Sequence, residues 1–353
     1  MNKTIISALV LAGMILGSNA QASDAREAVM RGGGNNVNAG SFYYDSMYNI
    51  FYNPVYINDM KNYVIFEKNQ GIGTAASMHG FNMAVYFNRN NAFGTNVTSV
   101  GASGVSSGAY ATAPVDFVIG GDAGVKWGLG LTYASNKVYG TDKTSSDLEA
   151  RAGISMNGLE PFVGFHIIGK NGASEDKNKG FNIGARYHYG EWTPYFSYVN
   201  KKWEDHTGAT TGDVKDNNWV VGLGREAKLG DSARLMYAVY YYRGKTESSD
   251  AAATGADKKV SGVPANVSVE ADATSWLTLR AGATHNVIGP RTAGFVATTA
   301  RVGGTFHMGK VDADFVFGND DNSGAASTGG NIDTSSVGFS DDTFSKVSLR
   351  YSW

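Results

Sequence analysis

The chain has 353 residues, a formal net charge of −2 and no cysteine. The lack of cysteine excludes a disulfide framework, thiolate chemistry and a Cys-ligated zinc site. The near-neutral charge gives no reason to expect nucleic-acid binding, and we expect none. Forty-six glycines and 12% aromatic residues, beside only six prolines, favour many strands joined by tight turns.

Residues 1–22 have the pattern of a secretory signal peptide. Lys3 supplies a positive charge, and residues 5–16 form a short apolar run. Ala20 and Ala22 are small residues at the two positions that a signal peptidase reads. Because the apolar run is too short to span a membrane comfortably as a helix, we expect export rather than anchoring.

Residues 23–77 do not follow the pattern of the rest of the chain. The stretch is rich in Gly, Asn and Tyr, and only 63–68 could form a strand. Counting that strand would make an odd total, whereas bacterial single-chain barrels normally have an even number. We therefore expect 23–77 to be mostly a plug folded into the lumen. The alternative is two more wall strands, 42–50 and 61–68, which would make sixteen.

The remaining residues, 78–353, contain recurring segments of about ten residues in which apolar and polar positions alternate. This pattern predicts an all-β fold, a transmembrane antiparallel β-barrel of about fourteen strands, with alternate residues facing lipid and lumen. The expected strands lie near 79–89, 113–121, 124–135, 147–156, 159–168, 179–189, 192–203, 216–227, 232–243, 263–273, 276–286, 294–308, 310–318 and 343–353.

The connections between these segments alternate in length. Short turns such as Asn157-Gly158 and Gly309-Lys310 are typical of tight hairpins. Long connections rich in Gly, Ser, Thr and Asn lie between them, for example 90–112, 244–262 and 319–342. Such alternation is expected when short turns face the periplasm and long loops face outward, and a soluble sandwich has no reason to show it.

The last strand shows the clearest alternation. Its polar face carries Lys346, Ser348, Arg350 and Ser352, and its apolar face carries Val347, Leu349, Tyr351 and Trp353. The apolar face with its terminal aromatic residue is similar to the signature that outer-membrane barrels present to the barrel assembly machinery. The resemblance implies that this apolar face is an assembly signal, that the assembly machinery and outer-membrane lipid are partners, and that the chain lies in the outer membrane of a Gram-negative bacterium.

The segment 45–57, which contains Tyr52, Asn53, Pro54 and Tyr56, resembles a short N-terminal motif of the fatty-acid-transporter-like barrel superfamily. In that superfamily an Asn-Pro dipeptide lies in the plug before the first strand. The resemblance therefore implies that these four residues belong to a plug and that the barrel has fourteen strands. The superfamily usually continues with Ala-Gly, whereas this chain has Val55-Tyr56. In size, loops and composition, the whole chain resembles the porin-like major outer-membrane proteins of predatory Gram-negative bacteria.

The polar faces of the expected strands carry many charges. An Arg or Lys on the lipid face costs about 2–4 kcal/mol near the midplane, so these charges are expected to line the pore. Opposed basic and acidic rows would select solutes by charge, with a slight anion preference. The other interpretation is pairing between neighbouring strands, for example Asp314 with Lys346 or Arg350. The expected pore-lining residues are Lys126, Glu149, Arg151, Arg186, Arg234, Glu270, Asp272, Arg280, Arg301, Asp312, Asp314, Lys346 and Arg350.

These patterns predict a porin-like channel for the passive diffusion of small hydrophilic solutes, narrowed chiefly by the loops 90–112 and 319–342. One alternative is a plugged transporter for hydrophobic compounds, which would need an apolar pocket. Another is a surface structural protein or adhesin whose exposed loops bind a partner. The residues that would line the apolar pocket are Tyr43, Tyr44, Phe51, Tyr52 and Tyr56.

Neither a cofactor nor an enzymatic activity is expected. The six histidines lack the spacing of a metal site. No linear motif marks a paired acid and base or a Ser–His nucleophile. The two resemblances differ on oligomeric state, since porins are often trimers and the fatty-acid-transporter superfamily is often monomeric.

Overall fold

The computed structural model describes residues 23–30, 42–60, 62–67, 71–88, 113–137, 140, 142–172, 177–205, 212–248, 258–288, 298–319 and 343–353. The expected signal peptide 1–22 and loop 90–112 lie outside the described residues, as do residues 249–257 and 320–342 of the other two long loops. Within the described ranges, no helix is long and apolar enough to cross a membrane.

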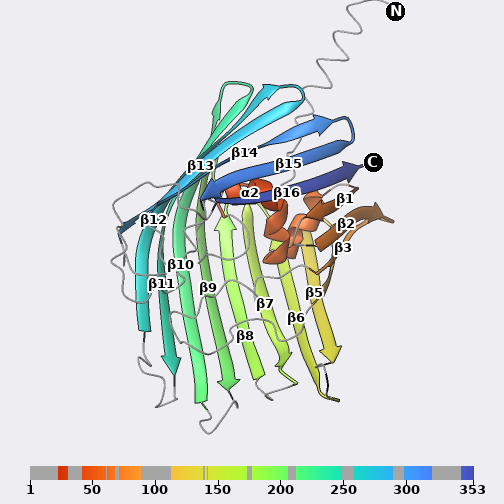
Figure 1. Ribbon diagram of the computed structural model, residues 1–353, viewed down its shortest axis with the longest axis vertical. Helices are drawn as coiled ribbons and strands as arrows, with labels where there is room; N and C mark the ends of the chain where they lie inside the picture. The colour runs from red at the N-terminus through yellow and green to blue at the C-terminus, as the bar shows by residue number, and fades with distance from the viewer. Residues whose placement is uncertain are drawn as a thin grey trace, which may run out of the picture.

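In the described part of the chain, sixteen antiparallel strands close into one barrel, with neighbours in chain order (Figure 1). The barrel closes where β1 pairs with β16, Tyr63 lying opposite Ser352 and Glu67 opposite Ser348. Closure gives the backbone groups at every strand edge a partner. The strands are β1 (Tyr63–Glu67), β2 (Gly71–Met78), β3 (Phe81–Phe87), β4 (Val115–Asp122), β5 (Lys126–Lys137), β6 (Thr144–Ser155), β7 (Leu159–Lys170), β8 (Lys177–Tyr187), β9 (Trp192–Asp205), β10 (Gly212–Leu229), β11 (Ala233–Ser248), β12 (Lys258–Thr274), β13 (Leu277–Ile288), β14 (Thr298–Met308), β15 (Val311–Asn319) and β16 (Thr343–Ser352).

All the strands expected between 79 and 353 are present, but the total of fourteen is wrong. Two further strands, β1 and β2, lie in the wall, so the described wall begins at Tyr63 rather than at residue 78. The alternative of sixteen strands is correct in number and in its strand at 61–68. Its other strand, 42–50, is wrong, because that stretch runs into a 3-10 helix, and β2 takes its place in the wall.

The short turns have the backbone that tight hairpins require. Asn157 and Gly158, between β6 and β7, have φ angles of 52° and 80°, as in the turns with two positive φ angles that match the twist of antiparallel strands. The turns between β8 and β9, β10 and β11, and β14 and β15 each contain a glycine of positive φ. The short turns and the C-terminus share one end of the barrel.

The two faces of the wall differ in polarity as the alternation predicts. Large apolar side chains face outward, among them Leu129, Phe165 and Val302, which are 51%, 50% and 55% exposed. Positions between them face inward and are often polar, as with Arg151, which is 3% exposed. An apolar exterior around a polar interior is the arrangement of transmembrane β-barrels.

Candidate functional site

Three short helices of the N-terminal segment, here the described residues 23–30 and 42–60, lie inside the barrel. They are α2 (Asp24–Met30), η1 (Met47–Phe51) and η2 (Pro54–Asp59). Helix α2 contacts β12 to β16, and η2 contacts β3 to β6. Figure 1 shows all three enclosed by strands near the end of the barrel where the C-terminus lies. The N-terminal segment therefore touches opposite sides of the inner wall.

Side-chain caps start both 3-10 helices. The Ser46 hydroxyl accepts a hydrogen bond from the Tyr48 backbone N–H at 3.2 Å, and the Asn53 side chain accepts one from the Val55 N–H at 3.2 Å. Pro54 follows Asn53 at the first helical position, where its fixed φ suits a helix and its missing N–H is not needed. The Asn-Pro dipeptide is thus the start of η2, and its local role is to turn the chain along the inner wall.

Two glycines of the wall make room for this turn. A Cβ atom at Gly128 would collide with the Pro54 carbonyl, and one at Gly153 would collide with the Asn53 side chain. Only glycine lets the N-terminal segment approach these two strands so closely. The wall sequence is therefore fitted to the segment that it surrounds.

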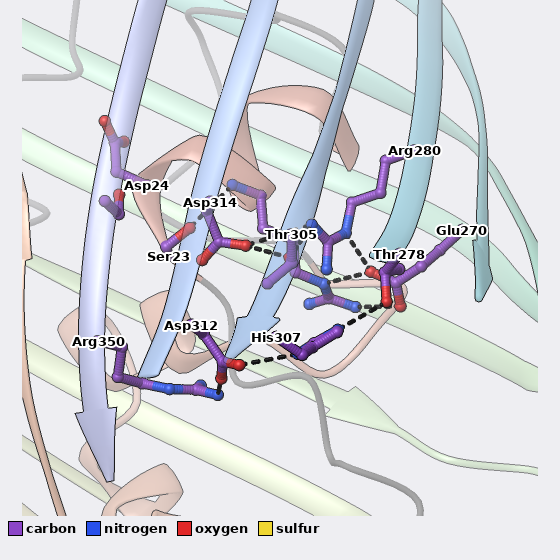
Figure 2. Close-up of polar contacts among 12 residues, drawn as sticks. Ser23, Asp24, Glu270, Thr278, Arg280, Thr305, His307, Asp312, Asp314 and Arg350 are labelled. Atoms are coloured by element: carbon purple, nitrogen blue, oxygen red, sulfur yellow. Dashed lines mark hydrogen bonds and ion pairs between the residues drawn. The ribbon is translucent and has the colours of Figure 1, made fainter. Parts of the chain in front are cut away.

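The Glu270 carboxylate, on β12, joins the N-terminal segment to the wall. It accepts hydrogen bonds from Arg26 of α2 at 2.7 and 3.1 Å, from Arg234 of β11 at 2.5 Å, and from Arg280 of β13. Figure 2 shows Arg280 continuing the contacts to Thr305 and Asp314. Buried ions need such partners because their desolvation is costly.

A second cluster surrounds Arg186 on β8. Its guanidinium donates to Glu160 of β7 and, at 2.5 Å, to Asp45 of the N-terminal segment. It also lies over the Tyr56 ring, 4.7 Å from the centroid, and the Tyr56 hydroxyl donates to Glu160. The Arg186 side chain is 1% exposed and Asp45 is 76% exposed. This cluster fixes the second half of the N-terminal segment to the wall.

Tyrosines of the N-terminal segment are deeply buried. Burial raises the pKa of Tyr44, Tyr52 and Tyr56 well above the ordinary value of 10.0. The Tyr44 hydroxyl also donates to Glu27 at 2.5 Å, and the negative charge of that carboxylate raises the pKa of Tyr44 further. All three phenols therefore stay neutral at neutral pH.

The residues expected around an apolar pocket instead pack into an aromatic cluster. Tyr43, Tyr44, Phe51, Tyr52 and Tyr56 are each at most 5% exposed. The Tyr52 ring contacts Phe162 of the wall at 5.0 Å between centroids, and Phe51 contacts Tyr86 at 5.0 Å. These rings hold the N-terminal segment against the wall.

The thirteen expected pore-lining residues all lie on the inner face of the wall, and most of their charges are paired. The expected partners of Asp314 pair elsewhere: Lys346 lies 2.9 Å from Asp24, and Arg350 pairs with Asp312. Asp314 itself accepts from Arg280, at 3.3 Å. Exposed pairs also occur, as between Lys126 and Asp59 of η2 at 2.5 Å.

A Thr–His–Asp arrangement lies at the short-turn end of the barrel (Figure 2). The ring nitrogens of His307 lie 2.8 Å from Asp312 Oδ1 and 2.9 Å from Thr278 Oγ1. This order of groups resembles that of hydrolase triads. However, Thr278 is 2% exposed and also donates to Asp272 at 2.6 Å, so its hydroxyl is committed to the wall and unavailable as a nucleophile.

Sequence reasoning missed several inward charges. Asp116, Glu160, Lys201 and Asp216 are all buried on the inner face, and all four lie within the ranges expected to be strands. Alternation with apolar neighbours could have identified Asp116 and Glu160, whereas Lys201 and Asp216 lie between polar residues. No such signal existed for Arg26, whose α2 helix has no barrel periodicity.

No family model matches the chain, and no curated protein matches it. Among solved structures, a loop L8 deletion mutant of OmpT, an outer membrane protein of Vibrio cholerae, is 12% identical over 83% of this chain and 96% of that chain, with a TM-score of 0.41. The toluene transporter TodX of Pseudomonas putida is 10% identical over 94% of this chain and 98% of that chain, with a TM-score of 0.37. The FrpB iron transporter from Neisseria meningitidis is 9% identical over 75% of this chain and 56% of that chain, with a TM-score of 0.40.

Proposed function

We propose that this protein is an outer-membrane channel through which small hydrophilic solutes diffuse, and that its N-terminal segment is a plug that narrows the channel. The observation that carries the proposal is the closed barrel itself, apolar outside and charged inside. In lipid only helices and closed barrels satisfy all their backbone groups. A charged inner face suits hydrated solutes better than apolar ones.

The size of the barrel supports an aqueous lumen. Barrels of sixteen to eighteen strands enclose a channel, whereas barrels of eight strands are filled by their own side chains. Here the N-terminal segment occupies part of that lumen and sets the size limit for solutes. Lipid contacts the outer face, and the assembly machinery recognises Val347, Leu349, Tyr351 and Trp353, all of which are exposed on β16 or just after it.

The hydrophobic-transporter alternative has less support. The aromatic residues that would bind an apolar ligand contact one another and the wall, and the inner face around them carries many charges. The adhesin alternative depends on the long loops, of which residues 90–112, 249–257 and 320–342 lie outside the described residues.

The test is single-channel conductance of the purified, refolded protein in a planar bilayer. Stable current steps that scale with salt concentration would support an open aqueous pore. A folded barrel that gives no steps would overturn the channel and favour one of the two alternatives. Deleting residues 25–56, which leaves every wall strand intact, should enlarge the steps if the N-terminal segment is a plug.

A further inference from the structure

Outward-facing basic side chains gather on one sector of the wall, at the long-loop end of β8 to β12. The strand register places them on the same face as outward apolar residues such as Ile183 and Val221, which are 42% and 47% exposed. No Lys or Arg faces outward from the described residues of β13 to β16 or of β1 to β4. The basic patch consists of Lys179, Lys202, Lys215, Arg243, Lys245 and Lys259.

A line of outward aromatic rings separates the basic patch from the apolar surface. The ring centroids of Phe181 and Tyr198 are 5.8 Å apart, and those of Trp219 and Tyr241 are 5.0 Å apart. Tyr198 lies directly opposite Trp219, so the line crosses β8 to β11. Aromatic girdles mark the boundary between hydrocarbon and headgroups in membrane barrels. Because the basic patch lies just beyond this line on each strand, it lies at the level of the headgroups.

The strands that carry most of the basic patch are longer than a bilayer requires. β9, β10, β11 and β12 have 14, 18, 16 and 17 residues, whereas about 9–11 residues cross the hydrocarbon. In Figure 1 these strands run down to the long-loop end, away from the N-terminal helices. When the short turns face the periplasm, this end lies in the outer leaflet. The extra length therefore displays the basic patch among outer-leaflet headgroups.

Three lysines of the basic patch lie directly opposite one another. Lys179, Lys202 and Lys215 form a lateral row across β8, β9 and β10. Like charges in such positions destabilise a sheet. Lys202 pairs with Glu204 at 3.4 Å and with Asp213 at 2.7 Å. Glu204 is also 3.9 Å from Lys179, so these two lysines share one carboxylate.

The rest of the basic patch has fewer carboxylates still. Lys215 lies opposite Glu247, but Glu247 pairs with Lys245. Lys259 lies opposite Lys245, which adds a second pair of like charges. Within the described ranges, Lys215, Arg243 and Lys259 make no ion pair. Six basic residues therefore share three described carboxylates on this outer face, which leaves three positive charges without counter-charges.

We propose that the basic patch binds the phosphate groups of anionic lipids in the outer leaflet. Lysine binds phosphate as a point charge, and basic residues beside a membrane attract anionic headgroups. An anionic headgroup at this level supplies the missing counter-charge while its acyl chains lie along the apolar surface below the aromatic line. The inference goes beyond the proposed channel, since it depends on the barrel being in the membrane and not on solute flow.

The test is native mass spectrometry of the full-length protein in detergent, with phosphatidylglycerol or phosphatidylcholine of the same acyl chains. We expect more bound phosphatidylglycerol. Lys179→Gln with Lys215→Gln should weaken its binding about tenfold and leave that of phosphatidylcholine unchanged. Lys228→Gln with Lys310→Gln removes the same charge at the short-turn end and is the matched control. Glu204→Gln with Glu247→Gln should strengthen the binding of phosphatidylglycerol.

Equal binding of the two lipids, or an equal loss in the two lysine double variants, would overturn the basic patch as a lipid site. Displacement of phosphatidylglycerol by equimolar inorganic phosphate would also overturn it, in favour of a site for a free anion. If the Lys179 and Lys215 double variant does not fold, as judged by circular dichroism, the Glu204 and Glu247 double variant still tests the proposal. Weaker phosphatidylglycerol binding by that variant would contradict the role of charge.

Discussion

Arg26 Nε lies 2.7 Å from Glu270 Oε2, although the two residues are 244 positions apart in the chain. This contact joins α2 to the wall, while Arg234 and Arg280 hold the same carboxylate from neighbouring strands. Replacing Arg26 therefore leaves Glu270 with counter-charges. A substitution of Arg26 can therefore weaken the attachment of the N-terminal segment without removing the ion pairs that stabilise the wall.

Arg26→Met should loosen the N-terminal segment without unfolding the barrel. The segment loses two hydrogen bonds to a charged group, each worth about 1.5–3 kcal/mol. We expect larger or more frequent current steps in planar bilayers than for the wild type. Arg225→Met, which breaks an exposed pair with Glu191, is the control. Conductance unchanged by Arg26→Met would mean that other contacts suffice to hold the segment.

Gly153→Leu should push the N-terminal segment off the wall. The new side chain would occupy the place of Asn53, and overpacking of this kind costs about 1–3 kcal/mol. Limited proteolysis should then cut within 42–60 faster than in the wild type. Ala152→Leu, on the opposite face of the same strand, should leave the cleavage rate unchanged. Equal rates for both variants would exclude close packing at Gly153.

Two basic residues of the inner face should differ sharply in how much their ion pairs contribute to stability. Arg280→Met removes a 1% exposed partner of Glu270 and Asp314 and should lower the free energy of unfolding by about 3–5 kcal/mol. Lys126→Met breaks a pair whose side chains are 39% and 54% exposed and should change it by about 0–1 kcal/mol. Urea unfolding of the refolded barrel measures both, and comparable losses would show that burial does not decide the difference.

Alkaline pH should release the N-terminal segment. Burial raises the pKa of Tyr44, Tyr52 and Tyr56 above 10.0, so the packed segment keeps protons that the released segment loses. Packing is unaffected below about pH 10 and weakens above it, by up to about 1.4 kcal/mol per pH unit for each tyrosine. Conductance followed from about pH 8 to about pH 11 should rise, and Tyr52→Phe should move the rise to higher pH. A flat profile would contradict this linkage.

Alternation was enough to locate the strands from 79 onward, because one face must meet lipid and the other must not. It failed at β2, where small residues such as Gly73 and Ala75 replace the β-branched and aromatic residues that mark a strand. Without β2, counting the strand that begins at Tyr63 gave an odd total, so that strand was assigned to the plug. The error in the strand number follows from this single weak segment.

The partners of the inward charges could not be predicted from the wall alone. Glu270 and Arg186 each bind a residue of the N-terminal segment, and that segment has no periodicity that relates it to any strand. Opposed basic and acidic rows were therefore expected where the structure shows mostly paired charges. Contacts between an irregular segment and a regular wall depend on the three-dimensional fold.

The number of backbone pairs between neighbouring strands varies around the barrel and is small where β1 closes it against β16. β1 has five residues, whereas β10, on the opposite side of the barrel, has 18. The two pairings of β1, with β16 and with β2, have five residue pairs each, the fewest among the described strands. Separating β1 from either neighbour thus exposes the fewest backbone groups to lipid, and that exposure is what opposes opening of the wall. Local opening of the barrel should begin at β1, and its amide hydrogens should be the first of the wall to exchange with solvent.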